Sequence, residues 1–210
     1  MIRSLLRFLV KSIQYSLVLI SNIYSTQLFR FLLWLNCVEA GNGIRAVKSI
    51  PSLIISRRAR RVLIGNGTVF NSYGDHSWYC KCSLWVREEA TLIIGDNVGM
   101  NGVMIYASDR VEIHDNVKIG GGTRISDSNH HSLDYMERRC AITDKGKTAP
   151  VIIEQDVFIG ANCTIMKGVT IGARSIIAAG SVIVKSVPAG SIAGGNPGKI
   201  IKSISYEHEC

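Results

Sequence analysis

Acidic residues are scarce at one end of this sequence. Residues 1–61 contain ten Lys and Arg against one acidic residue, Glu39, whereas the rest of the chain carries 14 basic and 15 acidic residues. The net charge of +8 therefore comes from the segment 1–61. This excess predicts contact with an anionic surface, and because the same segment is rich in Leu, Ile and Phe, a membrane is favoured over nucleic acid.

Cysteine pairs of the metal-binding kind are also lacking. None of the six cysteines forms a Cys-x-x-Cys pair, and their spacing does not match the disulfide framework of a small secreted domain. We therefore expect reduced thiols in a cytosolic protein. A zinc site built from His76, Cys80 and Cys82 is disfavoured, because a Cys-x-Cys pair lacks the usual two-residue spacer.

Charge is absent from residues 12–29, yet eight Ser, Thr, Asn and Gln residues in this stretch make it a poor membrane-spanning helix, and no small-residue cleavage site marks a signal peptide. Apolar residues at alternating spacings of four and three predict a helix over residues 1–36. Its apolar face is too broad for a solvated helix. Two interpretations stay open: the helix packs on the protein itself or a sister subunit, or it anchors the protein peripherally to a membrane, with help from basic residues within 1–61.

From residue 92 the chain is periodic. Every sixth residue from 153 is apolar, and two shorter runs upstream keep the same spacing: Ile153, Ile159, Ile165, Ile171, Ile177, Ile183 and Ala189, with Ile94 and Met100, and Ile113, Ile119 and Ile125. A six-residue period predicts a solenoid of stacked parallel strands, with about eighteen residues per three-sided coil. Small residues that follow the apolar positions suit the corners between faces: Gly95, Gly120, Gly160, Gly172, Ala178 and Gly190.

The register breaks between Ile125 and Ile153, whose separation is not a multiple of six. Residues 129–150 must therefore leave the coil as a polar loop, and loops on a rigid scaffold often carry function. The sequence thus divides into a helical segment at 1–36, a basic linker with irregular first coils at 37–91, a β-helix at 92–190 with the loop 129–150, and a tail at 191–210.

The run VIIEQDVFIGANCTIMKGVTIGARSIIAAGSVIVKSVPAGSIAGGNPGKII, residues 151–201, resembles the hexapeptide-repeat O-acetyltransferases that act on galactosides, maltose, streptogramins, capsules and lipopolysaccharides. This resemblance covers residues 92–202. It implies a mainly β fold, a left-handed parallel β-helix that forms homotrimers, with acetyl-CoA and the acceptor bound between subunits. The first 90 residues depart from the acidic helical start of the sugar acetyltransferases, and this leaves the acceptor open.

The resemblance also implies roles for individual residues. His130, five residues after Ile125, is the expected catalytic base, which takes the acceptor proton and returns it to the CoA thiolate. The acceptor is expected to contact Asn101, His131 and Phe158. The backbone N–H of Ala161 would bind the thioester oxygen. The remaining cofactor contacts implied by the resemblance are Ala179, Val184, Lys185, Lys199 and Lys202.

We therefore predict a cytoplasmic acetyl-CoA-dependent enzyme, or one peripheral to the inner face of the membrane, that acetylates a sugar hydroxyl of a surface glycan without a metal and without binding nucleic acid. Two alternatives stay open. A noncatalytic scaffold in polysaccharide assembly would not need His130. A zinc carbonic anhydrase on this fold would need three converging histidines, an arrangement that His76, His114, His130, His131 and His208 do not reproduce.

Overall fold

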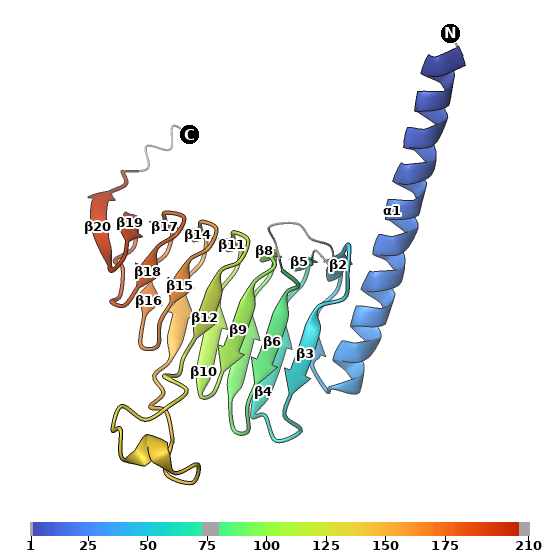
Figure 1. Cartoon of the computed structure of the whole chain (residues 1–210). Coiled ribbons are helices and arrows are strands. Elements are labelled where there is room, and N and C mark those ends of the chain that lie inside the picture. The colour runs from blue at the N-terminus through green and yellow to red at the C-terminus, as the bar shows by residue number, and fades with distance from the viewer. Residues whose placement is uncertain (1, 73–79, 206–210) are drawn as a thin grey trace.

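Three parallel sheets form the faces of a prism, and one long helix stands at its N-terminal end (Figure 1). The computed structural model describes residues 2–72 and 80–205. Helix α1 covers Ile2–Leu35, which confirms the helix predicted for residues 1–36. Each coil of the chain contributes one strand to each sheet in turn, so the mainly β repeat architecture is also confirmed.

The sheets are named here in the order in which the chain first reaches them. Sheet A contains β1 (Glu39–Ala40), β4 (Arg61–Ile64), β7 (Thr91–Ile94), β10 (Arg110–Ile113), β13 (Val151–Ile153) and β16 (Thr170–Ile171). Sheet B contains β2 (Arg45–Val47), β5 (Val69–Asn71), β8 (Gly99–Asn101), β11 (Lys118–Ile119), β14 (Phe158–Ile159), β17 (Ile176–Ile177), β19 (Ser191–Gly195) and β20 (Gly198–Ser203). Sheet C contains β3 (Ser52–Ile55), β6 (Ser83–Val86), β9 (Met104–Ala107), β12 (Arg124–Ser126), β15 (Thr164–Ile165) and β18 (Val182–Ile183).

The core is a set of apolar columns inside the prism. All six isoleucines of the predicted register from Ile153 to Ile183 are at most 1% exposed. Ile153 pairs with Ile171, eighteen residues further along, which is the predicted coil length. The prediction is wrong at Ala189, which is exposed. Val187 takes this inner position instead: it is 5% exposed, it forms a bridge with Ile171, and its N–H donates to the Thr170 carbonyl. The last coil is therefore two residues shorter than the regular ones.

Gly190 is a left-handed corner, with a φ of 64°, whereas other predicted corner glycines have a different physical basis. Gly120 and Gly160 do not adopt left-handed backbone angles; their neighbours in the next coil lie too close for a side chain. A Cβ on Gly120 would lie 2.4 Å from the backbone nitrogen of Ala161, and one on Gly160 would lie 2.5 Å from that of Ala179. Left-handed angles fall on further glycines and on several Asn residues, among them Asn97, with a φ of 55°, which that residue type tolerates.

Residues 37–91 were predicted to be a linker with irregular first coils, and the structure places β1 to β6 there within the same three sheets. Glu39 pairs with Leu63, and Arg61 pairs with Thr91, so both of these coils are longer than the regular ones. Their extra residues obscure the repeat in the sequence. The expected tail at 191–210 contains the antiparallel pair β19 and β20, and its residues 206–210 lie outside the described part.

The C-terminal third of α1 closes the first coil. The hydroxyl of Ser25 donates to the Ala46 carbonyl over 2.6 Å, and the Phe29 ring meets the Phe70 ring edge-on at 5.0 Å. Phe29 and Leu33 are fully buried. The N-terminal turns project beyond the prism (Figure 1). They expose apolar side chains on every side, so the body of a single chain covers only one end of the helix.

Candidate functional site

A long loop leaves the prism between β12 and β13, where the six-residue register breaks (Figure 1). Its two ends are joined as a short antiparallel bridge between Ser128 and Thr148. The carboxylate of Asp127 is fully buried and accepts the backbone N–H groups of Ser108, Asp109 and Arg110 from the preceding coil, at 2.7 to 3.0 Å. The base of the loop is therefore fixed to the rigid coils.

His131 forms an imidazole–carboxylate pair within this loop. Its Nδ1 lies 2.6 Å from Oδ2 of Asp144, and the other carboxylate oxygen accepts the backbone N–H of Ser132 at 2.8 Å. The hydrogen bond from His131, and then that from Ser132, hold the pKa of the Asp144 carboxyl below its ordinary value. A charged carboxylate fixes the tautomer with hydrogen on Nδ1 and leaves Nε2 to accept a proton. This is the arrangement of a general base with an orienting partner.

Ser132 ties Asp144 to the rest of the loop through its backbone and its hydroxyl. Its hydroxyl donates to Glu137, and the guanidinium of Arg138 donates to the Ser132 carbonyl over 2.7 Å. Glu137 and Arg138 belong to the 3₁₀ turn η1 (Glu137–Arg139) of this loop. The loop thus carries an internal polar network that positions the His131 pair.

His130, the residue predicted to be the base, has other neighbours. Its Nε2 lies 3.2 Å from the Ser126 hydroxyl, and its ring meets the Tyr106 ring edge-on at 4.4 Å. Its backbone is left-handed, with a φ of 65°. A Cβ on Gly146 would lie 2.6 Å from the His130 nitrogen, so the return segment of the loop presses against this residue. His130 therefore borders the outer face of sheet C, and the carboxylate partner belongs to His131.

Two predicted acceptor residues lie on sheet B. Asn101 at the end of β8 and Phe158 at the start of β14 line one hollow of about 200 Å³, together with Lys118. The Asn101 side chain accepts from the Asn71 amide at 2.6 Å, and Phe158 is 49% exposed. An amide, a cation and an exposed ring can contact the hydroxyl groups and the apolar face of a sugar.

The small residues predicted to contact the cofactor lie where sheet B meets sheet C. Ala161 and Ala179 stack directly on Gly120 and Gly160 of the preceding coils. Among the hydrogen bonds of the described residues, none uses the N–H of Ala161. This edge is therefore a strip of nearly bare backbone with a donor to spare, which suits a thin ligand such as the pantetheine arm of CoA.

The other predicted cofactor residues lie elsewhere. Val184, 45% exposed, and Lys185 follow β18, where sheet C meets sheet A. Lys199 and Lys202 are exposed on β20. The lysines sit at the C-terminal end of the prism.

The predicted residues fall into two groups that one chain does not bring together. The histidine loop, Val184 and Lys185 lie at the edge between sheets C and A, whereas Asn101, Ala161 and Ala179 lie at the edge between sheets B and C. The width of sheet C separates these edges, roughly 16 Å for about five extended residues. A site that uses both edges needs a second chain.

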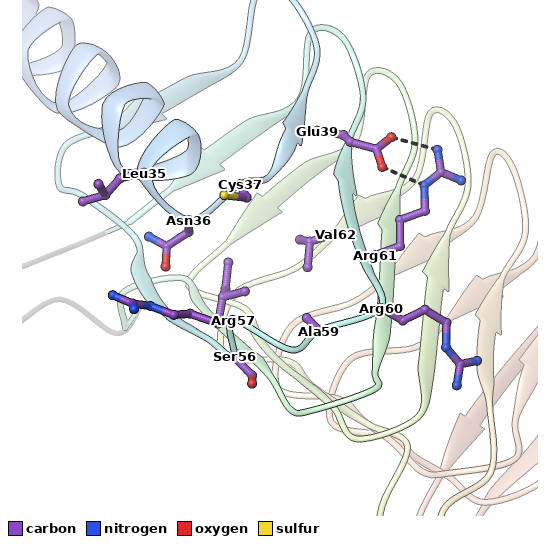
Figure 2. A pocket seen from close by; sticks show the side chains of 11 residues that line it. Leu35, Asn36, Cys37, Glu39, Ser56, Arg57, Ala59, Arg60, Arg61 and Val62 are labelled. Carbon is purple, nitrogen blue, oxygen red and sulfur yellow. Dashed lines mark hydrogen bonds and ion pairs between the residues drawn. The ribbon is translucent and has the colours of Figure 1, made fainter.

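A larger cavity of about 640 Å³ lies at the foot of α1 (Figure 2). Arg57, Arg60 and Arg61 line it, and Arg61 makes a bidentate pair with Glu39 at 2.9 and 3.0 Å. This cavity belongs to the first coil and contains no histidine. This cavity is therefore a different site from the histidine loop, which lies between β12 and β13.

Residues 2–72 and 80–205 contain no preformed set of metal ligands. No group of three or more His, Cys, Asp and Glu side chains is placed there to hold an ion. His76 and His208 lie outside the described residues. The cysteines at 37, 80, 82, 140 and 163 are free thiols.

Sequence reasoning missed three residues that shape the site. Asp127 and Asp144 are ordinary polar residues of a loop in the sequence, and the thirteen-residue separation of Asp144 from His131 carries no local signal. Tyr106 lies in the coil before the loop. It pairs with Ser126, twenty residues further along, so a coil of the predicted eighteen residues would not have brought the two together.

Comparison with known proteins supports the repeat. A family model described as the hexapeptide repeat of succinyl-transferase matches residues 150–185. A hexapeptide-repeat acetyltransferase of Vibrio cholerae, solved with acetyl coenzyme A, is 39% identical, with 55% of this chain and 61% of that chain covered and a TM-score of 0.50. A second structure from Vibrio cholerae, also of a hexapeptide-repeat acetyltransferase, covers 91% of this chain and 90% of its own at 28% identity, with a TM-score of 0.57.

Two further relatives differ in the group they acetylate. A maltose O-acetyltransferase structure from Clostridium difficile is 33% identical, with 54% of this chain and 60% of that chain covered and a TM-score of 0.50. A tetrahydropyridine-dicarboxylate N-acetyltransferase of Clostridium perfringens is 60% identical over 55 residues, which are 26% of this chain and 23% of the relative. The match thus spans about a quarter of that curated relative. Residues 150–185 thus match the hexapeptide repeat, and the chain is similar to solved hexapeptide-repeat acetyltransferases.

Proposed function

We propose that the protein is an acetyl-CoA-dependent O-acetyltransferase that acts on a sugar hydroxyl of a surface-glycan precursor, such as a capsule, O-antigen or lipopolysaccharide unit. The observation that carries this proposal is the pair between His131 Nδ1 and Asp144 Oδ2 in an exposed loop. A hydroxyl attacks a thioester poorly until a base removes its proton, and an oriented imidazole supplies that base.

In this proposal His131 is the base, and His130 contacts the acceptor, so the roles predicted from the sequence are exchanged. Nε2 of His131 takes the proton as the sugar oxygen attacks the acetyl carbonyl. The same nitrogen then gives the proton to the departing sulfur of CoA. The charge of Asp144 stabilises the imidazolium that exists between these steps. No acyl-enzyme is needed, because acceptor and donor react directly.

Acetyl-CoA binding would use the edge between sheets B and C. The N–H of Ala161 is available for the thioester oxygen as negative charge develops there. Ala179 leaves room for the pantetheine arm, and Val184 would pack on it from the other edge. Lys185, Lys199 and Lys202 would attract the nucleotide phosphates. Acetyl-CoA use is supported by the 39% identical Vibrio cholerae structure that contains it.

A homotrimer would bring the two edges together. We propose that the histidine loop of one chain faces the Ala161 and Ala179 edge of the next, so that three equivalent sites form by rotation. The separation of the two groups across sheet C supports this arrangement. We also infer that the coils are left-handed, as the resemblance to the family implies.

Transfer to oxygen is favoured over transfer to nitrogen by the likeness to the maltose enzyme. The test uses radiolabelled acetyl-CoA with hydroxyl-bearing and amino-bearing sugars, both soluble and lipid-linked. We expect a product that loses its label in mild alkali, since esters hydrolyse there and amides do not. An alkali-stable product would replace this proposal with N-acetylation, and no transfer to any acceptor would contradict both.

Membrane contact is the second part of the proposal. One helix, within residues 7–35, is long and apolar enough to cross a membrane by length and composition, and only 17% of its most apolar window is buried. Exposed Ile13, Leu17 and Ile20 and the basic residues within 1–61 suit an anionic bilayer at its cytoplasmic surface. We expect the protein to cosediment with anionic vesicles, and less so in high salt. Truncation of residues 1–24, which keeps the Ser25 and Phe29 contacts, should remove this binding; unchanged sedimentation would contradict it.

A further inference from the structure

A straight row of outward-facing side chains, exposed at Ile54 and Trp85 and half-buried at Tyr106 and Ser126, crosses the outer face of sheet C. Strand register places Ile54 beside Trp85, Trp85 beside Tyr106, and Tyr106 beside Ser126. Ile54 is 50% exposed and Trp85 is 40% exposed. Residues in the same register position of parallel strands lie about 4.8 Å apart, so the row advances by one coil at each step.

The row ends at the histidine loop. The Trp85 and Tyr106 rings are 6.1 Å apart at 38°, and the Tyr106 ring contacts that of His130 at 4.4 Å. The Ser126 hydroxyl lies 3.2 Å from His130 Nε2. The row therefore ends at His130, the proposed acceptor contact, which is next in sequence to the proposed base His131.

The row combines apolar ring faces with polar groups, and this combination suits a carbohydrate ligand. Its rings offer flat apolar faces on which the C–H side of a pyranose can stack. Polar groups lie at its border, because the Arg87 guanidinium donates to the Tyr106 hydroxyl at 3.5 Å and Ser126 lies at its end.

We propose that the row of Ile54, Trp85 and Tyr106 is a platform for the acceptor saccharide, which binds sugar rings beyond the one that reacts. This proposal rests on the proposed function, because it takes the histidine loop as the reaction centre. A sugar ring with its linkage spans about one coil spacing, so the row holds two or three rings. The enzyme would thus prefer an oligosaccharide to a monosaccharide, and the chain of sugars would extend toward the first coil and α1.

The direct test uses the fluorescence of Trp85 in the full-length assembly. Trp34→Phe combined with Trp78→Phe leaves Trp85 as the one tryptophan of the chain. The probes are glucose, galactose and N-acetylglucosamine, each as oligomers of one to four rings. We expect saccharides to shift the emission of Trp85, with an affinity that rises through three rings. No response to any probe, or equal affinity for one ring and three, overturns the platform.

The kinetic test compares matched substitutions. Trp85→Ala and Tyr106→Ala should each raise the KM for an oligosaccharide acceptor about tenfold and leave the KM for acetyl-CoA unchanged. Tyr106→Phe keeps the ring and should retain most of the affinity. Trp34→Ala is the control, because it removes an exposed tryptophan, 71% exposed, on α1 and should change neither constant. An unchanged acceptor KM in Trp85→Ala overturns the proposal.

The two proposals fail in different ways. If Trp85 responds to saccharides and no acetyl group is transferred, the platform stands and the proposed function fails. If transfer occurs and Trp85 is silent, the function stands and the platform fails. Protection of Trp85 from acrylamide in the assembly, lost when the assembly dissociates, would show that a sister chain covers the row and would also overturn the platform.

Discussion

The two edges of sheet C are built on opposite principles. Where sheet C meets sheet A, the chain departs into a polar loop whose side chains form a hydrogen-bonded network around His131. Where sheet C meets sheet B, the side chains are small, and Gly120 and Gly160 let the backbone of successive coils stack closely. One edge carries chemical groups and the other carries an unobstructed strip of backbone.

This difference shows why a repeat fold can carry a catalytic site. Coils with similar apolar inner columns leave their edges free to vary, because the residues of those columns fill the core. An insertion at one edge adds reactive groups, and small residues at another add a binding strip. Each edge is incomplete by itself. We therefore expect that substitutions at one edge mainly affect catalysis and that substitutions at the other mainly affect cofactor binding.

The largest effect is expected at the loop edge. His131→Gln should lower kcat for acetyl transfer by about 10³-fold, because the base is lost while the core is untouched. His130→Gln should cost less than about tenfold, as it removes an acceptor contact. Steady-state kinetics with acetyl-CoA and a sugar acceptor would compare the two. The reverse order, with His130→Gln inactive, would restore His130 as the base, as the sequence predicted.

Loss of the orienting carboxylate should come next. Asp144→Asn should reduce kcat roughly 10²-fold, because the amide no longer stabilises the imidazolium. The KM for acetyl-CoA should not change, since Asp144 contacts His131 and Ser132 and none of the residues proposed to bind the cofactor. Asp134→Asn, in the same loop, serves as the control. If Asp144→Asn retained full activity, the pair would have no catalytic role.

The binding strip should respond through the cofactor. Ala179→Trp should lower kcat/KM for acetyl-CoA about 30-fold by filling the strip, with a thermal midpoint close to that of the unmodified protein, because Ala179 is exposed. Ala189→Trp places the same side chain at another exposed corner and should have no effect. Calorimetric titration with CoA checks the result. Normal CoA binding by Ala179→Trp would remove this edge from the site.

The smallest effect concerns a thiol in the histidine loop. Backbone N–H groups of Ile142 and Thr143, with the Thr143 hydroxyl, lower the pKa of the Cys140 thiol. A lowered pKa means that the thiolate forms at a lower pH. Iodoacetamide should therefore modify Cys140 at a pH where the exposed Cys37 reacts more slowly. Peptide mass spectrometry would measure both rates, and equal rates would contradict the hydrogen bonding assigned to this part of the loop.

Much of the fold could be predicted from the sequence. The six-residue period located the inner columns from Ile153 to Ile183, and the break after Ile125 located the loop. The first coils escaped prediction because they are longer than the regular ones and their extra residues obscure the repeat, although Phe70 and Leu84 occupy the same columns. Ala189 was misplaced because a repeat has no local signal for a coil that shortens.

The site was less predictable than the fold. The resemblance to the family indicated that the histidine pair matters, but only tertiary structure shows which histidine meets a carboxylate. The Asp144 side chain reaches His131 because η1 and the Ser132 network fold the loop back on itself, and such a contact has no periodicity to reveal it. Likewise, the division of the predicted residues between two edges depends on the coil geometry.

The measurement that tests the central claim most directly is complementation between the edges. His131→Gln chains and Ala179→Trp chains, each nearly inactive alone, would be unfolded together, refolded and checked for mixed assemblies by native mass spectrometry. In a randomly mixed trimer about a quarter of the shared sites would have both edges intact, so transfer should recover to about a quarter of the unmodified rate. Mixed trimers that stay as inactive as their parents would contradict a site shared between chains.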